Sequence, residues 1–346
     1  MHMARNGLTR RAALTGGAAL GLLPDVLRTA TAADGVDLDA ARREGKVSLY
    51  TSAPIAAAQK VATAFEQKFG IKVELFRSGG TEILRRFMTE RDAGRIGADV
   101  LVTSDPAAAI DFAAKGLFVP FKPAGFEQVP SALNDPAGNY IAQRVSLIAI
   151  YARTDLLAAA DMPKTWDDLT RPQYKGKLVM TDPSFTSLQV SVIAMLSKLR
   201  GWDYYEQLNR NDVLIVPSNE QAINLVKSGE RPIAAGADAQ YANEARLAGH
   251  PVRNIFPSDG TFAIPAVTAV VRGAAHPNAA KLLAEYHLSL EAQRLWPADG
   301  IYAARSDVDP PAGSPAIATV NVLPMDFPFI QRSTQTVKKR FHEIFS

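Results

Sequence analysis

Three short segments near the start of the chain share one design: KVSLYTS (Lys46–Ser52), KVELFRS (Lys72–Ser78) and DVLVTSD (Asp99–Asp105). Each has the apolar content of a buried strand, ends in small hydroxyl residues and precedes a segment whose apolar residues recur at helical spacing. This β-α-β-α-β order predicts an α/β fold with a mainly parallel sheet and right-handed crossovers.

The residues that follow these strands are the first candidates for a binding site. Parallel sheets bind ligands in the crevice at the carboxyl ends of their strands, so these residues should surround one mouth. None of them is a nucleophile with a base beside it, and a rim of hydroxyls and backbone N–H groups is expected to bind rather than to catalyse. They are Thr51, Ser52, Ser78, Gly79, Gly80, Thr81, Ser104 and Asp105.

Residues 1–32 have the pattern of a secretory signal peptide. Arg5, Arg10 and Arg11 precede the apolar run Ala12–Leu23, and Ala30-Thr31-Ala32 is a small-x-small cleavage pattern. The run is shorter than the ~20 residues of a membrane-spanning helix. The sequence TRRAAL around the arginine pair resembles a twin-arginine export signal, and an ordinary signal that contains two arginines is the alternative.

Charge and cysteine content exclude several classes of function and of covalent modification. Four of the 38 basic residues and one of the 35 acidic residues lie within 1–32, so the remainder carries 34 of each and shows no basic excess for nucleic acid. The chain has no cysteine, which excludes disulfides, thiolate metal sites and a lipid-modified cysteine. We therefore expect a protein that is exported to the periplasm, soluble and without a lipid anchor.

A second α/β series follows, between two long apolar segments at 140–151 and 261–271. Its expected strands are 178–181, 213–216 and 232–235. We interpret the two long segments as hinge strands that join lobe 1 (33–143 and 266–346) to lobe 2 (144–265), with the C-terminal helix touching both lobes. Two sequential domains without a shared hinge are the alternative.

Several blocks of the sequence resemble periplasmic solute-binding proteins of ABC importers. They are KVSLYTS, FEQKFGIKVELFRSGGTEIL, ADVLVTSD, WDDLTRPQYKGKLVMTDP, HPNAAKLLAEYHLSLEAQRL and GIYAARSDV. The similarity is greatest to the branch that contains ferric-iron, phosphonate and sugar-phosphate binders. It implies a two-lobed type 2 periplasmic binding fold that closes around a solute and delivers it to a permease in the inner membrane. We expect a monomer without a cofactor.

The resemblance also raises the alternative of an iron binder. Iron-binding members of this branch use two adjacent tyrosines of the second lobe, but here Tyr241 is followed by Ala242. The adjacent pair Tyr204-Tyr205 lies in a predicted helix and is interpreted as packing. We predict no metal site; Tyr241 is the ligand expected if iron binds after all.

Two predicted helix starts on opposite lobes suit an anion. Ser78-Gly79-Gly80-Thr81 lies before one helix, and Asp182–Ser187, with Ser184, Thr186 and Ser187, lies before another. Free N–H groups and the helix dipole favour an anion at such positions, although plain helix capping explains the same residues. Ser218-Asn219 begins a third helix with the same two interpretations. We predict a phosphonate, sugar phosphate or carboxylate as the ligand.

Arg144 and several side chains of the second lobe complete the predicted site. Arg144 lies in the first hinge strand and offers a two-pronged fork to such an anion. Tyr241 offers a hydroxyl or a stacking surface, and Asp105, Asp238 and Asp259 could receive an ammonium or sugar hydroxyls, as an aminophosphonate would require. Asp259-Gly260 also fits a simple turn. Arg77 is a weaker candidate for ligand binding, because strand alternation should turn its side chain away from Ser78.

Two functions of other classes are alternatives to transport. The histidines after the leader, His250, His276, His287 and His342, have no catalytic or metal-binding spacing, so we predict that the chain is not an enzyme. A ligand-sensing partner of a membrane signalling receptor would have the same fold and remains an alternative to transport.

Overall fold

The computed structural model describes residues 36–346. The predicted signal peptide lies outside these residues. Within them, no helix is both long and apolar enough to cross a membrane.

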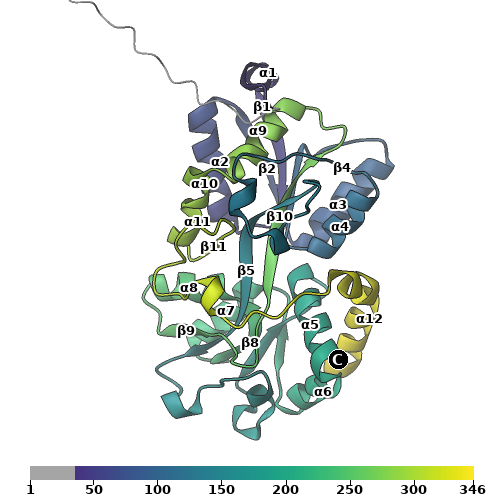
Figure 1. Cartoon of the computed structure of the whole chain (residues 1–346). Coiled ribbons are helices and arrows are strands. Elements are labelled where there is room, and N and C mark those ends of the chain that lie inside the picture. Colours follow the sequence, from purple (N-terminus) through teal and green to yellow (C-terminus); the bar gives the residue numbers. More distant parts are fainter. Residues whose placement is uncertain (1–35) are drawn as a thin grey trace, which may run out of the picture. The chain divides into compact units, whose positions relative to one another are not determined.

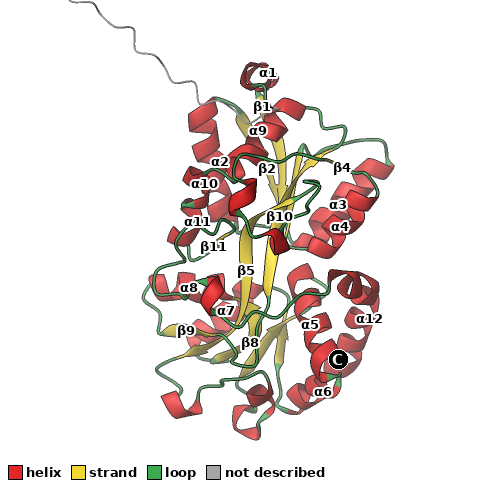
Figure 2. Ribbon diagram, viewed as in Figure 1, coloured by secondary structure: helices red, strands yellow, loops and turns green. Residues whose placement is uncertain are grey.

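The first lobe is built on the three strand segments Lys46–Ser52, Lys72–Ser78 and Asp99–Asp105. β1 pairs in parallel with β2 and with β3, as the β-α-β-α-β order predicts. Helices α2 and α9 cover one face of this sheet, and α3 and α4 cover the other (Figures 1 and 2). The elements up to the first crossing are α1 (Leu38–Glu44), β1 (Lys46–Thr51), α2 (Ile55–Phe69), β2 (Lys72–Arg77), α3 (Gly80–Asp92), β3 (Val100–Thr103), α4 (Pro106–Ala114) and β4 (Phe118–Val119).

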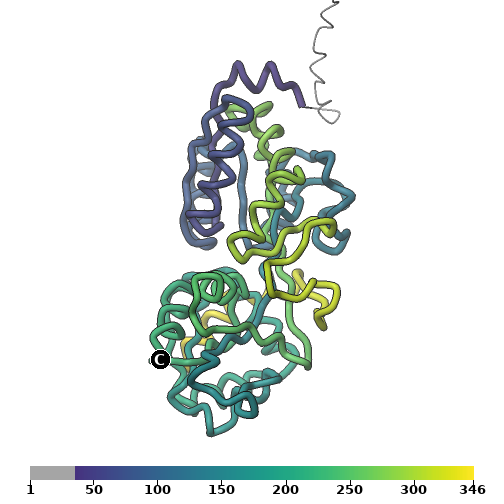
Figure 3. The backbone as a smooth tube through the Cα atoms, turned by 90° about the vertical axis from the view of Figure 1, so that its left-hand side faces the viewer, coloured from purple at the N-terminus to yellow at the C-terminus, as the bar shows by residue number. Residues whose placement is uncertain are grey.

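Two long antiparallel strands run from one lobe into the other. β5 (Ile141–Arg153) and β10 (Ala263–Val271) pair side by side and are buried along nearly their whole length (Figure 1). The first half of β5 pairs with β10 and β11, and its second half pairs with β8 and β9. The same strand therefore belongs to both lobes, and the backbone narrows where it passes between them (Figure 3).

The second lobe repeats the parallel pattern. β6 pairs in parallel with β7 and β8, so the strand order across the described sheet is β2-β1-β3-β10-β5-β8-β6-β7. Its elements are β6 (Leu178–Thr181), α5 (Ser187–Arg200), α6 (Asp203–Arg210), β7 (Leu214–Val216), α7 (Asn219–Ser228), β8 (Ile233–Asp238), α8 (Ala239–Leu247) and β9 (Val252–Ile255).

The segment after β10 returns to lobe 1 and then leaves it. It forms α9 (Pro277–His287), α10 (Leu290–Gln293), α11 (Leu295–Ala298), β11 (Tyr302–Ala303) and α12 (Phe327–Phe345). α12 packs on α5 and α6 of the second lobe and also contacts α4 of the first. Its buried Ile330, Val337 and Phe341 join the core of the second lobe. The C-terminal helix thus touches both lobes, although most of its apolar face lies on lobe 2.

His287 gives the first lobe a measurable pH dependence. Its ring is buried on α9, its Nδ1 lies 3.2 Å from the Thr268 hydroxyl, and burial lowers its pKa to about 3. Below pH 6.5 the unfolded chain binds a proton here and the folded chain does not, so the free energy of unfolding should fall by about 1.4 kcal/mol per pH unit. From pH 7 to pH 5 this group alone accounts for a loss of about 2 kcal/mol.

Urea denaturation at pH 7 and pH 5 measures this dependence. His287→Gln removes the titration, so its unfolding free energy should change less with pH than that of the parent. His250→Gln, at an exposed position, is the control and should keep the parental dependence. An equal pH dependence in the parent and in His287→Gln would contradict the assignment.

Candidate functional site

A cavity of about 330 Å³ lies between the carboxyl ends of the strands of the two lobes. Both lobes and the crossing strand β5 contribute to its wall. We call it the anion chamber. Its lining residues are Ser52, Arg77, Ser78, Gly79, Gly80, Glu82, Ser104, Arg144, Ser146, Phe185, Thr186, Ser187, Leu188, Pro217, Ser218, Asn219, Glu220, Asp238, Gln240 and Tyr241.

Four helices, α3, α5, α7 and α8, begin at the wall of this chamber. α5 and α7 are capped by their own side chains, since Thr186 accepts from the N–H of Gln189 and Ser218 accepts from the N–H of Gln221. α3 begins after Gly79 and has no side-chain cap. Helix N-termini carry partial positive charge and N–H donors, so four of them around one cavity favour an anionic ligand.

Gly79 and Gly80 let the two lobes approach each other closely. A Cβ atom on Gly79 would lie 3.2 Å from the carbonyl oxygen of Phe185, and one on Gly80 would lie 2.5 Å from the Ser187 hydroxyl. At the second distance either the Ser187 hydroxyl must turn away or α3 must shift. The absence of side chains on the glycine pair therefore allows the close approach of α3 to α5, and no special backbone angle is involved.

Arg144 is the central charge of the chamber. Its side chain is 2 % exposed, its Nη2 donates to the Ser104 hydroxyl at 3.0 Å, and its buried Nε has no acceptor among residues 36–346. Burial lowers the pKa of this guanidinium, and the nearby charge of Asp238 opposes that effect. A buried cation that lacks a hydrogen-bonded counter-ion is costly, so the site is suited to a ligand that supplies the negative charge.

Asp238 lies across from Arg144 at the end of β8. Its carboxylate accepts from the N–H of Gln240 and so caps α8. Burial raises its pKa, and the Ser146 hydroxyl, Arg144 and the capped N–H act in the opposite direction. A carboxyl group therefore stands in the same chamber as the buried guanidinium, where it can accept from a donor group of the ligand.

A chain of contacts from Arg77 to Tyr241 links the lobes at one side of the chamber. Arg77 Nε donates to the carbonyl oxygen of Ala53 at 3.1 Å, and its Nη2 lies 3.4 Å from Oε1 of Glu220. The Tyr241 hydroxyl donates to the same Oε1 at 3.2 Å. Burial raises the pKa of Tyr241 well above its ordinary value, and the negative charge of Glu220 raises it further, so the phenol stays neutral.

Arg77, a weaker candidate in the sequence, also lines the chamber. β2 ends at Arg77, so the chamber at the strand end is within reach of its long side chain as well as of Ser78. The hydrogen bond to the carbonyl oxygen of Ala53 holds the guanidinium at the chamber wall.

The structure brings most of the expected binding residues together. Those that line the chamber are Ser52, Ser78, Gly79, Gly80, Ser104, Arg144, Thr186, Ser187, Asp238 and Tyr241. Those that do not are Thr51, Thr81, Asp105, Ser184 and Asp259.

Local hydrogen bonds explain three of the excluded positions. Thr51 Oγ1 accepts from the N–H of Ala53, and the Asp105 carboxylate accepts from the N–H of Ala108 as the cap of α4. The Ser184 hydroxyl pairs at 2.8 Å with Nε2 of His342 on α12. These polar groups are engaged in turns, a helix cap and a contact to the C-terminal helix.

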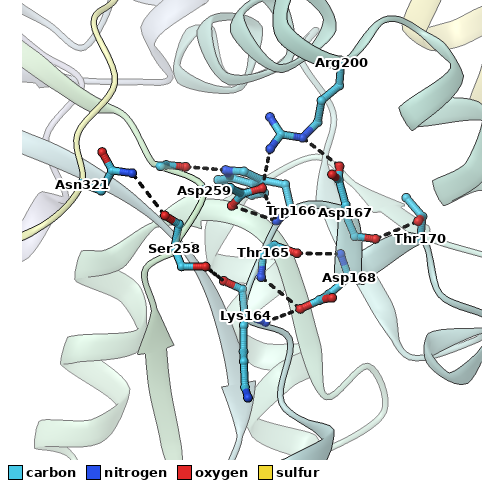
Figure 4. A network of polar contacts seen from close by, with 11 residues as sticks. Lys164, Thr165, Trp166, Asp167, Asp168, Thr170, Arg200, Ser258, Asp259 and Asn321 are labelled. Carbon is cyan, nitrogen blue, oxygen red and sulfur yellow. Dashed lines mark hydrogen bonds and ion pairs between the residues drawn. The ribbon is translucent and has the colours of Figure 1, made fainter.

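Asp259 belongs to a separate network in the second lobe (Figure 4). Its carboxylate accepts from the N–H of Trp166 at 3.3 Å and forms an ion pair with Arg200, and Arg200 also donates to Asp167 at 2.9 Å. The indole N–H of Trp166 donates to the carbonyl oxygen of Gly260 at 2.7 Å. The network fastens the turn before β10 to the end of α5, so Asp259 stabilises the lobe instead of facing the ligand.

Some chamber residues were outside the expected set, and two simple signals could have identified them. Ser146 lies two residues after Arg144 on the same strand and so shares its face. Glu220 and Gln240 lie in the first turns of the helices after β7 and β8, where the strand-end rule applies as it does in lobe 1. The others are Glu82, Phe185, Leu188 and Pro217, whereas Ser218 and Asn219 belong to the third helix start that the sequence indicated.

The adjacent tyrosines are part of the core, as predicted. Tyr204 and Tyr205 on α6 are buried and pack edge to face at 5.1 Å between ring centroids. Within residues 36–346, no group of three or more histidine, aspartate or glutamate side chains is placed to hold a metal ion.

Comparisons with known proteins give matches to bacterial solute-binding proteins. Residues 97–331 match the family model described as "Bacterial extracellular solute-binding protein". A protein of Salmonella typhimurium named "Putative 2-aminoethylphosphonate-binding periplasmic protein" is 31% identical over 260 residues, which cover 71% of this chain and 74% of the relative.

Solved structures share the fold at low sequence identity. The periplasmic binding protein AfuA from Actinobacillus pleuropneumoniae, with fructose-6-phosphate bound, matches with a TM-score of 0.78 and 20% identity over 87% of this chain and 98% of its own. Iron-bound HitA from Pseudomonas aeruginosa matches with a TM-score of 0.76 and 19% identity over 86% of this chain and 99% of its own. At this identity the two structures establish the two-lobed fold alone.

The Asp259 network predicts a stability effect. Asp259→Asn removes the ion pair with Arg200, whose partners are only 16% and 24% exposed, and should lower the free energy of unfolding by about 1–2 kcal/mol. Asp167→Asn is the matched control because Asp167 contacts the same arginine from a side chain that is 72% exposed, and it should cost less than about 0.5 kcal/mol. Urea denaturation of both variants measures the difference, and equal losses would contradict it.

Proposed function

Because the chain belongs to the family of bacterial extracellular solute-binding proteins, we propose that it captures a small organic anion in the anion chamber and presents it to a permease in the inner membrane. The chain is a substrate-binding component of an ABC transporter of this class. The phosphonate, sugar-phosphate or carboxylate chemistry of its ligand is the proposal.

The buried guanidinium of Arg144 is the observation that supports this proposal most directly. Arg144 lies in the central strand β5. Its Nη2 donates to the Ser104 hydroxyl, its Nε has no acceptor, and no carboxylate of the described residues forms an ion pair with it. Guanidinium groups bind phosphate and carboxylate oxygens through two parallel hydrogen bonds. The start of α3, which no side chain caps, adds further donors to the same chamber.

The names of similar proteins support the same ligand class. The Salmonella relative is named for 2-aminoethylphosphonate, and AfuA was solved with fructose-6-phosphate. Both compounds join a phosphorus oxyanion to an organic group with further donors. Asp238 gives this chamber a carboxyl group that can accept from an ammonium or a hydroxyl.

Ligand capture would use the two crossing strands as a hinge. Arg144 and Ser146 lie on the hinge strand β5, Ser78–Gly80 lie on lobe 1, and Thr186 and Ser187 lie on lobe 2. A ligand that contacts all three parts stabilises the closed arrangement over the open one. The periplasm is the compartment in which such a component meets both its solute and its permease.

The alternative of ferric iron receives less support from the side chains. Fe³⁺ prefers several anionic oxygen ligands, and Tyr241 is a neutral phenol that donates to Glu220. The buried Arg144 would repel a trivalent cation. Ferric citrate should nevertheless be tested as a ligand, because HitA, which shares the fold, was solved with iron bound.

Arg144→Gln should separate ligand binding from folding. The change removes charge-assisted hydrogen bonds to the ligand and should weaken the tightest-binding anion by about 100-fold. It also removes a buried charge without an ion-pair partner, so the melting temperature of the ligand-free protein should stay equal or rise.

The measurement is isothermal titration of protein that has been unfolded and refolded to remove carried ligand. The panel contains phosphate, methylphosphonate, 2-aminoethylphosphonate, fructose 6-phosphate, citrate and ferric citrate. Arg144→Lys is the control that keeps the charge and should lose less affinity than Arg144→Gln. Unchanged anion affinity in Arg144→Gln, or binding of ferric iron alone, would overturn the proposal.

Gly80→Ala should weaken binding without harming the fold. The added Cβ would lie 2.5 Å from the Ser187 hydroxyl and hold the lobes apart, so affinity should fall by about tenfold or more. Alanine is the better helix former, so thermal stability of the ligand-free protein should not fall. The double variant Gly80→Ala/Ser187→Ala removes the clashing oxygen and should lose less affinity than the product of the two single effects. Strict additivity would show that the lobes do not need this close approach.

A further inference from the structure

A second cavity of about 370 Å³ lies beside the anion chamber in the same groove between the lobes. We call it the lateral chamber. Both chambers are lined by Arg77, Glu220 and Tyr241, so these three side chains form the wall that they share. The other lining residues of the lateral chamber are Pro54, Ile55, Ala56, Ile223, Asn224, Lys227, Glu244, Ala245, Ala248 and His250.

The shared wall is made of side chains and can part. Arg77 belongs to lobe 1, whereas Glu220 and Tyr241 belong to lobe 2. Their contacts, 3.4 Å and 3.2 Å, are at the long end of the hydrogen-bond range. The side chains of Arg77 and Glu220 are 31% and 50% exposed, and an ion pair in such a position contributes little to stability. Opening of the lobes therefore separates Arg77 from Glu220 and Tyr241 and joins the two chambers.

The lining of the lateral chamber differs from that of the anion chamber. The lobe 1 side presents Pro54, Ile55 and Ala56, and the side chain of Ile55 is an exposed large apolar group. The lobe 2 side combines the apolar Ile223 with charged or polar heads such as Lys227 and Glu244. A surface with an apolar flank and hydrogen-bonding heads suits an organic group better than it suits a second bare oxyanion.

We infer that the lateral chamber binds the organic substituent of an anion whose charged group lies at Arg144. This inference rests on the proposed function and adds the class of ligand: a substituted phosphonate, phosphate ester or carboxylate with hydrogen-bonding groups on its carbon chain. The substituent enters while the lobes are apart and passes Arg77, Glu220 and Tyr241, which then close around the link between the two parts. Burial of Ile55 against it contributes apolar contact that an unsubstituted anion cannot make.

Asn224→Trp tests the inference by filling the lateral chamber. Asn224 is an exposed residue of α7 that lines the lateral chamber but not the anion chamber. Gln221→Trp is the matched control, because Gln221 is exposed on the same helix and lines neither chamber. Titrations use phosphate and methylphosphonate as small probes, and 2-aminoethylphosphonate, 4-aminobutylphosphonate and fructose 6-phosphate as substituted probes.

The parent protein should bind at least one substituted probe about tenfold more tightly than methylphosphonate. Asn224→Trp should remove this advantage and leave the affinity for methylphosphonate unchanged, and Gln221→Trp should change neither. Equal affinity of the parent for small and substituted probes would overturn the inference and leave the proposed function intact. An equal loss for both kinds of probe in Asn224→Trp would do the same, whereas a parent that binds no anion of the panel would overturn both.

Discussion

The antiparallel pair of β5 and β10 holds the two lobes of this protein together, because β5 is shared between them and β10 joins it to β3 of lobe 1. β5 pairs with lobe 1 strands in its first half and with β8 and β9 in its second half. A shared strand cannot leave either sheet without breaking a ladder of hydrogen bonds, so the lobes stay in register while a narrow connection between them can bend. Arg144 lies on this strand, and its position is therefore set by the sheet and not by a mobile loop.

The charged groups of the anion chamber lower the stability of the ligand-free protein. Arg144 is buried without an ion pair, Asp238 is buried with a raised pKa, and α3 begins at the wall without a side-chain cap, whereas α5, α7 and α8 are capped. The buried guanidinium and the uncapped start of α3 are unfavourable until an anion arrives. A binding protein benefits from this arrangement because the energy released by the ligand then favours closure of the lobes.

Not every polar group at a strand end faces the ligand. Asp105 and Asp259 occupy positions that the strand-end rule includes, yet one caps α4 and the other secures Trp166 and Arg200. The same residue types serve in caps, turns and binding sites, and the difference lies in which partner is closer once the chain has folded. α12 illustrates the point at a larger scale, since its contact with Ser184 draws that hydroxyl away from the chamber.

The sequence by itself determined the parallel strands, the long crossing segments and most of the chamber's hydroxyls and glycines. Those features depend on apolar periodicity and on residues next to strand ends, which are local properties of the chain. Only the tertiary structure decided that Arg77 lines the chamber, that Asp259 belongs to a separate network, and that Glu220 of the other lobe contacts both Arg77 and Tyr241. These contacts join residues far apart in the chain, and their directions follow from packing and hydrogen-bond competition that no local pattern encodes.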